Sequence, residues 1–93
     1  LLVNCTPVGM LKSETEGGIP LPVELVPRGI AVVDLVYNPP CTPLLELAQT
    51  SSSIAIGGLK MLIYQGVASL ELWTGQQAPM DVMLDAATRE LYR

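Results

Sequence analysis

The sequence predicts an α/β domain built on parallel strands. Three apolar, strand-like segments (residues 1–5, 30–37 and 53–56) alternate with helical segments that begin at Thr42 and after Gly58. The middle segment is a nearly continuous apolar run rich in Val and Ile, which is typical of a strand covered on both faces of a parallel sheet. A strand–helix–strand–helix order predicts parallel strands joined by right-handed crossovers.

The first two strands are separated by a long loop. Residues 6–29 contain four prolines and a polar cluster at 12–16, so we expect irregular structure there with room for one helical turn. The connection to the second strand therefore carries little regular structure of its own.

The middle strand has an interruption and a clear end. Asp34 interrupts it, and Asn38-Pro39-Pro40 should end it after Tyr37.

The helix that follows has clear boundary signals. Thr42 and Pro43 form an N-cap and first-turn pair, and the helix should run to about Thr50. A further helix is expected from Pro79, with Met80, Met83, Leu84, Ala87 and Leu91 on one apolar stripe. Its charges suit the helix dipole, because Asp81 lies near the amino end and Arg89 and Arg93 lie near the carboxyl end.

The helix expected from residue 59 to Gly75 is apolar on two faces. One stripe comprises residues 59, 62, 63, 66, 67, 70 and 73. A second face comprises Met61, Gln65, Ala68 and Leu72, which predicts a helix placed between two packing partners. Gln65, if covered, needs hydrogen-bond partners that a polar ligand could supply; the plainer alternative is a glutamine that caps nearby backbone groups or faces water.

Composition narrows the function classes. A 93-residue chain with 49% hydrophobic residues forms at most one small globular domain. A net charge of −4 with five Lys and Arg argues against nucleic-acid binding, and no apolar run approaches the ~18 residues of a membrane span. The absence of histidine and of a CxxC spacing excludes a zinc site and histidine acid–base chemistry within the chain. Two lone cysteines, of which Cys5 is expected to be buried, suit a reducing cytoplasm.

Small or polar residues converge on one edge of the predicted sheet. They follow the three strands as Asn4-Cys5-Thr6, Tyr37-Asn38 and Gly57-Gly58 with Met61. Ligands of open α/β sheets bind beyond the carboxyl ends of the strands, so these segments predict a binding cleft without identifying its ligand. The chain also starts within an apparent buried strand, which leads us to expect a piece of a longer protein.

Three of these segments resemble the shikimate dehydrogenase family, NADP-dependent enzymes that reduce 3-dehydroshikimate to shikimate. Residues 2–10 are similar to its N-A-T-P-x-G-M segment, residues 34–45 to D-x-x-Y-x-P…T-P-L-L, and residues 58–75 to G-L-G-M-L-x-x-Q…W-x-G. The resemblance implies the second half of a Rossmann-like nucleotide-binding domain with three parallel strands, plus carboxyl-terminal helices. Residues 1–75 would be a partial NADP-binding domain with a substrate-contacting helix, and residues 76–93 a carboxyl-terminal helix.

The resemblance also implies roles for individual residues. The positions that match cofactor contacts are Thr6, Leu35, Gly58 and Met61, and those that match contacts to the cyclohexene acid are Tyr37 and Gln65. Plainer interpretations remain: a turn residue for Thr6, helix packing for Met61 and a hydroxyl in water for Tyr37. Lys60 departs from the family's glycine, and could alter the seating of the nicotinamide.

By the same resemblance, the glycine-rich turn, the basic residues for the 2′-phosphate and the catalytic Lys-Asp pair lie upstream of Leu1. No catalytic residue and no metal ligand is therefore assigned in this chain, which we expect to be inactive alone and to form a homo-oligomer. A cytoplasmic quinate/shikimate dehydrogenase is an alternative parent enzyme. A non-catalytic scaffold module derived from the fold is an alternative of a different class.

Overall fold

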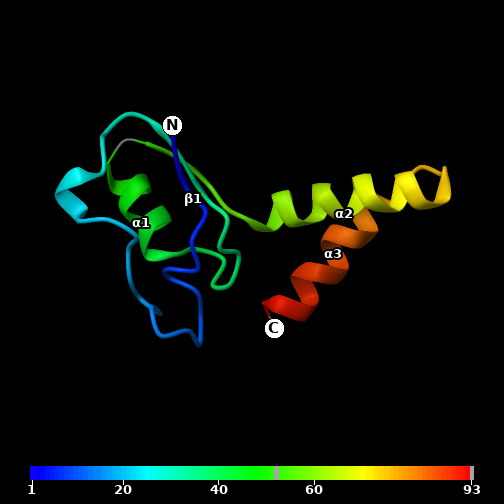
Figure 1. Ribbon diagram of the computed structural model, residues 1–93, viewed down its shortest axis with the longest axis horizontal. Coiled ribbons are helices and arrows are strands. Elements are labelled where there is room, and N and C mark those ends of the chain that lie inside the picture. Colours follow the sequence, from blue (N-terminus) through cyan, green and yellow to red (C-terminus); the bar gives the residue numbers. More distant parts are fainter. Residues whose placement is uncertain (52, 93) are drawn as a thin grey trace. The chain divides into compact units, whose positions relative to one another are not determined.

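The computed structural model describes residues 1–51 and 53–92, which form two compact units, Leu1–Gly58 and Leu59–Arg93 (Figure 1). The dipole interaction predicted for Arg93 lies outside the described residues. The sequence-based division after residue 75 follows expected ligand roles rather than compactness, and it stays a prediction. Among the helices of the described residues, none has the length and apolarity that crossing a membrane requires.

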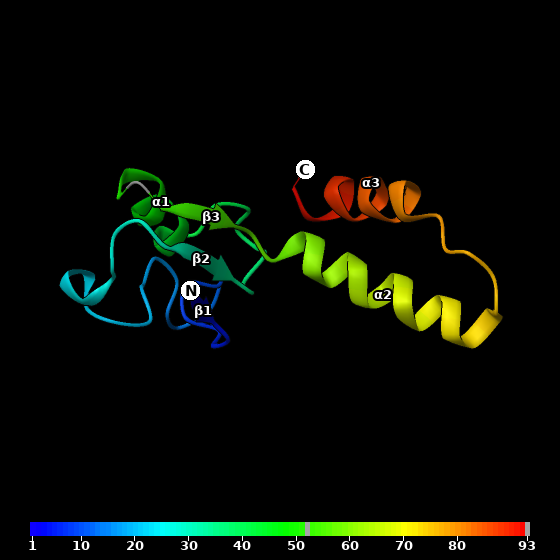
Figure 2. The same cartoon turned by 90° about the horizontal axis from the view of Figure 1, so that it is seen from above.

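The first unit contains a parallel sheet of three strands, as the sequence predicted. β1 (Leu2–Asn4), β2 (Ala31–Asp34) and β3 (Ile54–Ile56) lie in the order β1-β2-β3 within the described chain, and Figure 2 shows them side by side. The register places Asn4 opposite Asp34 and Val32 opposite Ala55. The carboxyl ends of all three strands therefore face the same edge of the sheet.

α1 (Pro43–Thr50) begins and ends where its capping signals predicted. Thr42 is the N-cap, and its hydroxyl oxygen accepts a hydrogen bond from the Leu45 backbone N–H at 3.3 Å. The helix packs against β2 and β3, and this contact forms the core of the unit, which comprises Val26, Val32, Leu44, Leu45 and Ala48. The expected helical turn in the long loop is a 3₁₀ turn over Val23–Leu25.

β2 is shorter than the sequence predicted, because it ends at Asp34 rather than at Tyr37. The Leu35 N–H still donates to the Asn4 backbone oxygen at 3.1 Å. The next N–H, that of Val36, donates instead to the Asp34 side-chain Oδ1 at 3.0 Å. A side chain thus takes over from the strand ladder at Val36, and β2 ends at Asp34.

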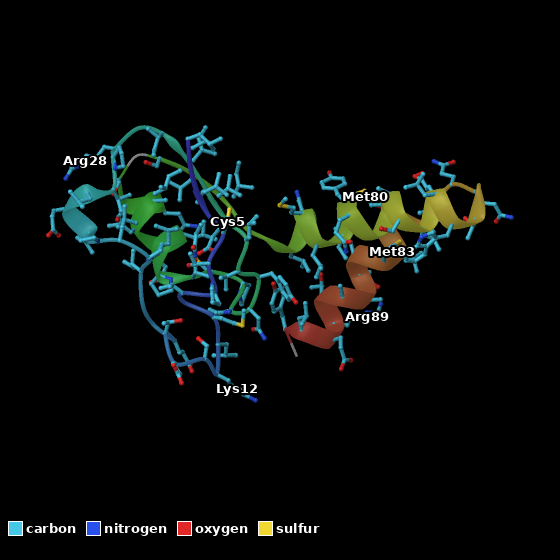
Figure 3. All side chains as sticks on the ribbon, in the orientation of Figure 1. Cys5, Lys12, Arg28, Met80, Met83 and Arg89 are labelled. Atoms are coloured by element: carbon cyan, nitrogen blue, oxygen red, sulfur yellow. The ribbon has the colours of Figure 1, made fainter. Side chains whose placement is uncertain are left out.

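The second unit consists of α2 (Leu59–Thr74) and α3 (Met80–Leu91). α2 ends at Gly75, whose φ of 67° is readily adopted by glycine and whose N–H donates to the Glu71 oxygen at 2.9 Å. The helices pack together through the first stripe of α2, where Ile63 is buried and Met83 of α3 approaches Gly66. Figure 3 shows Met80 and Met83 on the segment that lies beside α2.

The second apolar face of α2 has no cover in the part of the chain that the structure describes. Met61, Gln65, Ala68 and Leu72 are all exposed, and Leu72 is 84% exposed. Trp73, predicted on the covered stripe, is 81% exposed because it lies in the last turn of the helix. The expectation of two packing partners is therefore met on one face alone, since α3 occupies the first stripe.

Candidate cofactor and substrate site

A buried polar cluster joins the ends of β1 and β2 to the start of α1. Asp34 is fully buried, and Asn4 and Thr42 are nearly so. The Asp34 Oδ1 accepts from Asn4 Nδ2 at 3.0 Å and from the Val36 N–H at 3.0 Å, while its Oδ2 accepts from the Thr42 hydroxyl at 2.6 Å. A buried carboxylate without partners would be very costly, and these three donors meet that requirement.

Thr6 is held at the end of β1 by this cluster. Its N–H and its hydroxyl both donate to Asn4 Oδ1, at 3.0 and 2.6 Å, and its hydroxyl oxygen accepts from the Val8 N–H at 3.2 Å. The structure thus supports the interpretation of Thr6 as a turn residue. The side chain is also exposed, and these hydrogen bonds fix its orientation at the end of β1.

A hollow of about 180 Å³ opens beside Thr6. It is lined by Leu2, Val3, Asn4, Cys5, Thr6, Pro20 and Leu21. Clefts for whole drug-sized ligands measure roughly 300–1,000 Å³, so this hollow is too small to enclose such a ligand whole. The lining contains no basic side chain, and Lys12 and Arg28 project from other loops of the unit (Figure 3). The side chains around the hollow are therefore apolar or uncharged polar groups.

Gly58 and Leu35 are in direct contact. Gly58 is buried, and a Cβ atom at this position would lie 2.8 Å from the Asp34 oxygen, 2.7 Å from the Leu35 carbonyl carbon and closer still to the Leu35 oxygen. Only glycine allows this approach of two backbones. The structure thus brings together two of the predicted cofactor residues, with half-buried Tyr37 two residues beyond Leu35.

Met61 and Gln65 lie one helical turn apart on the exposed face of α2, in the second unit. Gln65 is exposed in this chain, because α3 packs against the opposite stripe. Its Nε2 donates to the Leu62 backbone oxygen at 2.9 Å, which matches the plainer alternative. Met61 is 55% exposed, so packing within the unit does not account for it.

Two further features concern reactive groups. Cys5 was expected to be buried but is exposed, because β1 ends at the inward-facing Asn4 and the chain then leaves the sheet. Cys41 is also a free, exposed thiol. Among residues 1–51 and 53–92, no group of three or more His, Cys, Asp or Glu side chains could hold a metal ion.

The cluster of Asn4, Asp34 and Thr42 was not predicted as a unit from the sequence, where Asp34 appeared as an interruption of the strand and Thr42 as a helix cap. An available signal was the presence of an aspartate in a strand predicted to be covered on both faces, since such a group requires buried donors.

Comparison with known proteins identifies the family. Residues 58–88 match the shikimate 5'-dehydrogenase C-terminal domain. The chain is 45% identical over 93 residues to the shikimate dehydrogenase (NADP(+)) of Methanothermobacter thermautotrophicus, a match that covers 100% of this chain and 32% of the relative. The chain thus spans about a third of the length of the curated relatives it matches.

Solved structures agree with this result. The shikimate 5-dehydrogenase of Thermus thermophilus, in complex with NADP(H) and shikimate, is 42% identical with a TM-score of 0.85, over 97% of this chain and 33% of that one. A shikimate dehydrogenase in complex with NADP+ is 34% identical with a TM-score of 0.87, over 98% and 31%. The fold and the matches over nearly all of its residues show that this chain belongs to the shikimate dehydrogenase family, to whose carboxyl-terminal part it corresponds.

Proposed function

We propose that this chain supplies the carboxyl-terminal part of an NADP-dependent shikimate dehydrogenase, which reduces 3-dehydroshikimate to shikimate. The observation that carries the proposal is the exposed face of α2: Met61 and Gln65, which the sequence resemblance matches to ligand contacts, are not packed within their own unit.

The cofactor side of the proposal rests on Thr6, Leu35, Gly58 and Met61. The hollow beside Thr6 would receive an uncharged part of NADP, and the Leu35–Gly58 contact would form a smooth backbone surface at the end of β2. Bound NADPH would supply the hydride. Residues in another part of the enzyme would hold its phosphates, because the lining of the hollow contains no basic side chain.

The substrate side rests on Tyr37 and Gln65. A phenol and a carboxamide both donate and accept hydrogen bonds, so they suit the hydroxyl and carboxylate groups of a cyclohexene acid. We assign Tyr37 and Gln65 to substrate binding, and we assign no catalytic residue to this chain. Residues 1–75 would bind cofactor and substrate, and residues 76–93 would support the α2 helix. We place the enzyme in the cytoplasm, because two free thiols suit a reducing compartment.

Two rival functions remain distinguishable. A quinate/shikimate dehydrogenase would use the same residues and would differ in its turnover of quinate. A non-catalytic scaffold module would lack activity altogether. An upstream G-x-G-G turn and a Lys-Asp pair in the same reading frame would eliminate the scaffold.

A segment exchange tests the proposal. The matched segment of the Methanothermobacter relative is replaced by this chain, and NADPH oxidation is measured with 3-dehydroshikimate, with quinate and NADP+ assayed in parallel. We expect reduction of 3-dehydroshikimate with little turnover of quinate. A folded chimera that binds NADPH but reduces no 3-dehydroshikimate would refute the proposal, and comparable turnover of quinate would establish the dual-specificity alternative.

A further inference from the structure

We propose that Asp34, with Asn4 and Thr42, is a positioning unit that fixes the segment bearing Thr6 relative to the segment bearing Leu35 and Tyr37. The cofactor-contacting and substrate-contacting segments would then respond together to any change in this unit. This inference rests on the proposed function for the ligands involved, but its structural part concerns hydrogen bonds within the first unit alone.

On the β1 side, the amide nitrogen and the amide oxygen of the Asn4 side chain each form two hydrogen bonds. Its Nδ2 donates to Asp34 Oδ1 at 3.0 Å and to the Val8 backbone oxygen at 3.2 Å, and its Oδ1 accepts both the N–H and the hydroxyl of Thr6. The Asn4 amide therefore transmits the position of Asp34 directly to Thr6. Rotation of the amide would break four hydrogen bonds at once.

On the β2 side, the same Asp34 oxygen fixes the second segment. Oδ1 accepts from Asn4 Nδ2 and also from the Val36 N–H, which lies between Leu35 and Tyr37 in the chain. One atom thus joins the two segments. The other oxygen, Oδ2, accepts from the Thr42 hydroxyl, which is itself held by the Leu45 N–H at the start of α1. The helix and its core contacts therefore anchor the carboxylate.

A purely structural role explains this arrangement poorly. Apolar side chains of similar volume fill a core as well as a buried polar group does, and often with equal or greater stability. A buried network whose donors and acceptors are all satisfied instead fixes one arrangement of its members. Among the described residues, no buried side-chain nitrogen or oxygen lacks a partner. The network ends at the strand termini that bear the predicted ligand contacts.

The first test measures both ligands in the chimeric enzyme. Asn4→Asp opposes two carboxylates at the 3.0 Å Asn4–Asp34 contact while leaving the residues after β2 intact. We expect the KM values for NADPH and for 3-dehydroshikimate both to rise about tenfold, the scale of one buried hydrogen bond. Asp34→Asn is the conservative variant, because an amide oxygen in the place of Asp34 Oδ1 still accepts from Asn4 Nδ2 and from the Val36 N–H, and both KM values should rise much less than in Asn4→Asp. Ser13→Ala, which removes loop hydrogen bonds outside the network, should change neither KM.

A rise in the NADPH KM alone, or a rise in Asp34→Asn as large as in Asn4→Asp, would overturn the inference. Unchanged KM values in Asn4→Asp would also overturn it, because a merely structural role lowers the amount of folded enzyme and leaves both KM values unchanged. The second test needs no activity and so separates this inference from the proposed function. In the 93-residue chain, amide hydrogen exchange should accelerate about tenfold or more at both Thr6 and Val36 in Asn4→Asp, and much less at both in Asp34→Asn. Acceleration confined to Thr6 would show that the two segments are independent, even if the chimera is active.

Discussion

Replacement of Gly58 by alanine should destabilise the first unit strongly. The new Cβ would lie 2.8 Å from the Asp34 oxygen, 2.7 Å from the Leu35 carbonyl carbon and closer still to the Leu35 oxygen. These are backbone atoms at the end of a paired strand, so they cannot move aside by rotating a side chain. Overpacking of a core typically costs about 1–3 kcal/mol, and contacts this close place Gly58→Ala at the upper end, about 3 kcal/mol.

Gly57→Ala is a matched control one residue away. A Cβ at Gly57 would meet the Leu45 Cδ1 and the Pro40 oxygen at 3.8 Å, which is ordinary van der Waals contact. Urea denaturation of the 93-residue chain, followed by circular dichroism, should show a free energy of unfolding lowered by about 3 kcal/mol for Gly58→Ala and by less than about 1 kcal/mol for Gly57→Ala. Equal losses for the two variants would refute the proposed backbone contact between β2 and the residue before α2.

Three further predictions concern stability, cofactor binding and association. Thr42→Ala removes the N-cap bond to Leu45 and the 2.6 Å bond to Asp34, so denaturation should show a free energy of unfolding lowered by about 2–4 kcal/mol. Thr42→Ser keeps the hydroxyl and should lower the free energy of unfolding by about 1 kcal/mol. Lys60→Gly in the chimera should leave NADPH affinity unchanged or improve it, because Lys60 is exposed where the family has glycine; a large loss of affinity on titration would show that the lysine is a ligand. The isolated chain should have no shikimate:NADP activity. It should also associate with itself at micromolar concentration, because β1 leaves an open strand edge and α2 a bare apolar face. Light scattering that finds a stable monomer would contradict this association.

The order and most boundaries of the elements could be predicted because their signals are local. Thr42 and Pro43 specify the start of α1, and Gly75 specifies the end of α2. The end of β2 could not be predicted, because it depends on the Asp34 side chain capturing the Val36 N–H. The two apolar faces of α2 could be recognised, but which face is covered depends on how α3 packs against it.

The same distinction applies to the candidate site. Parallel strands bring their carboxyl ends to one edge, so Thr6 and Tyr37 could be placed there from strand order alone. The link between Asn4 and Asp34 requires the register that sets them opposite each other, which the lengths of the segments do not determine. Sequence patterns therefore identified the edge of the sheet and missed the hydrogen bonds that organise it.

The most direct test of the central claim is the effect of Gln65→Ala on substrate binding in the chimeric enzyme. Gln65 is exposed and bonds only its own helix among the hydrogen bonds of the described residues, so the substitution should change stability by less than about 0.5 kcal/mol. Gln49→Ala, at an exposed glutamine of α1, is the matched control. Steady-state kinetics should show that Gln65→Ala weakens shikimate binding by about 1–3 kcal/mol with little change in the KM for NADP, while Gln49→Ala changes neither. An unchanged shikimate KM and turnover in Gln65→Ala would contradict the assignment of α2 as the substrate-contacting helix.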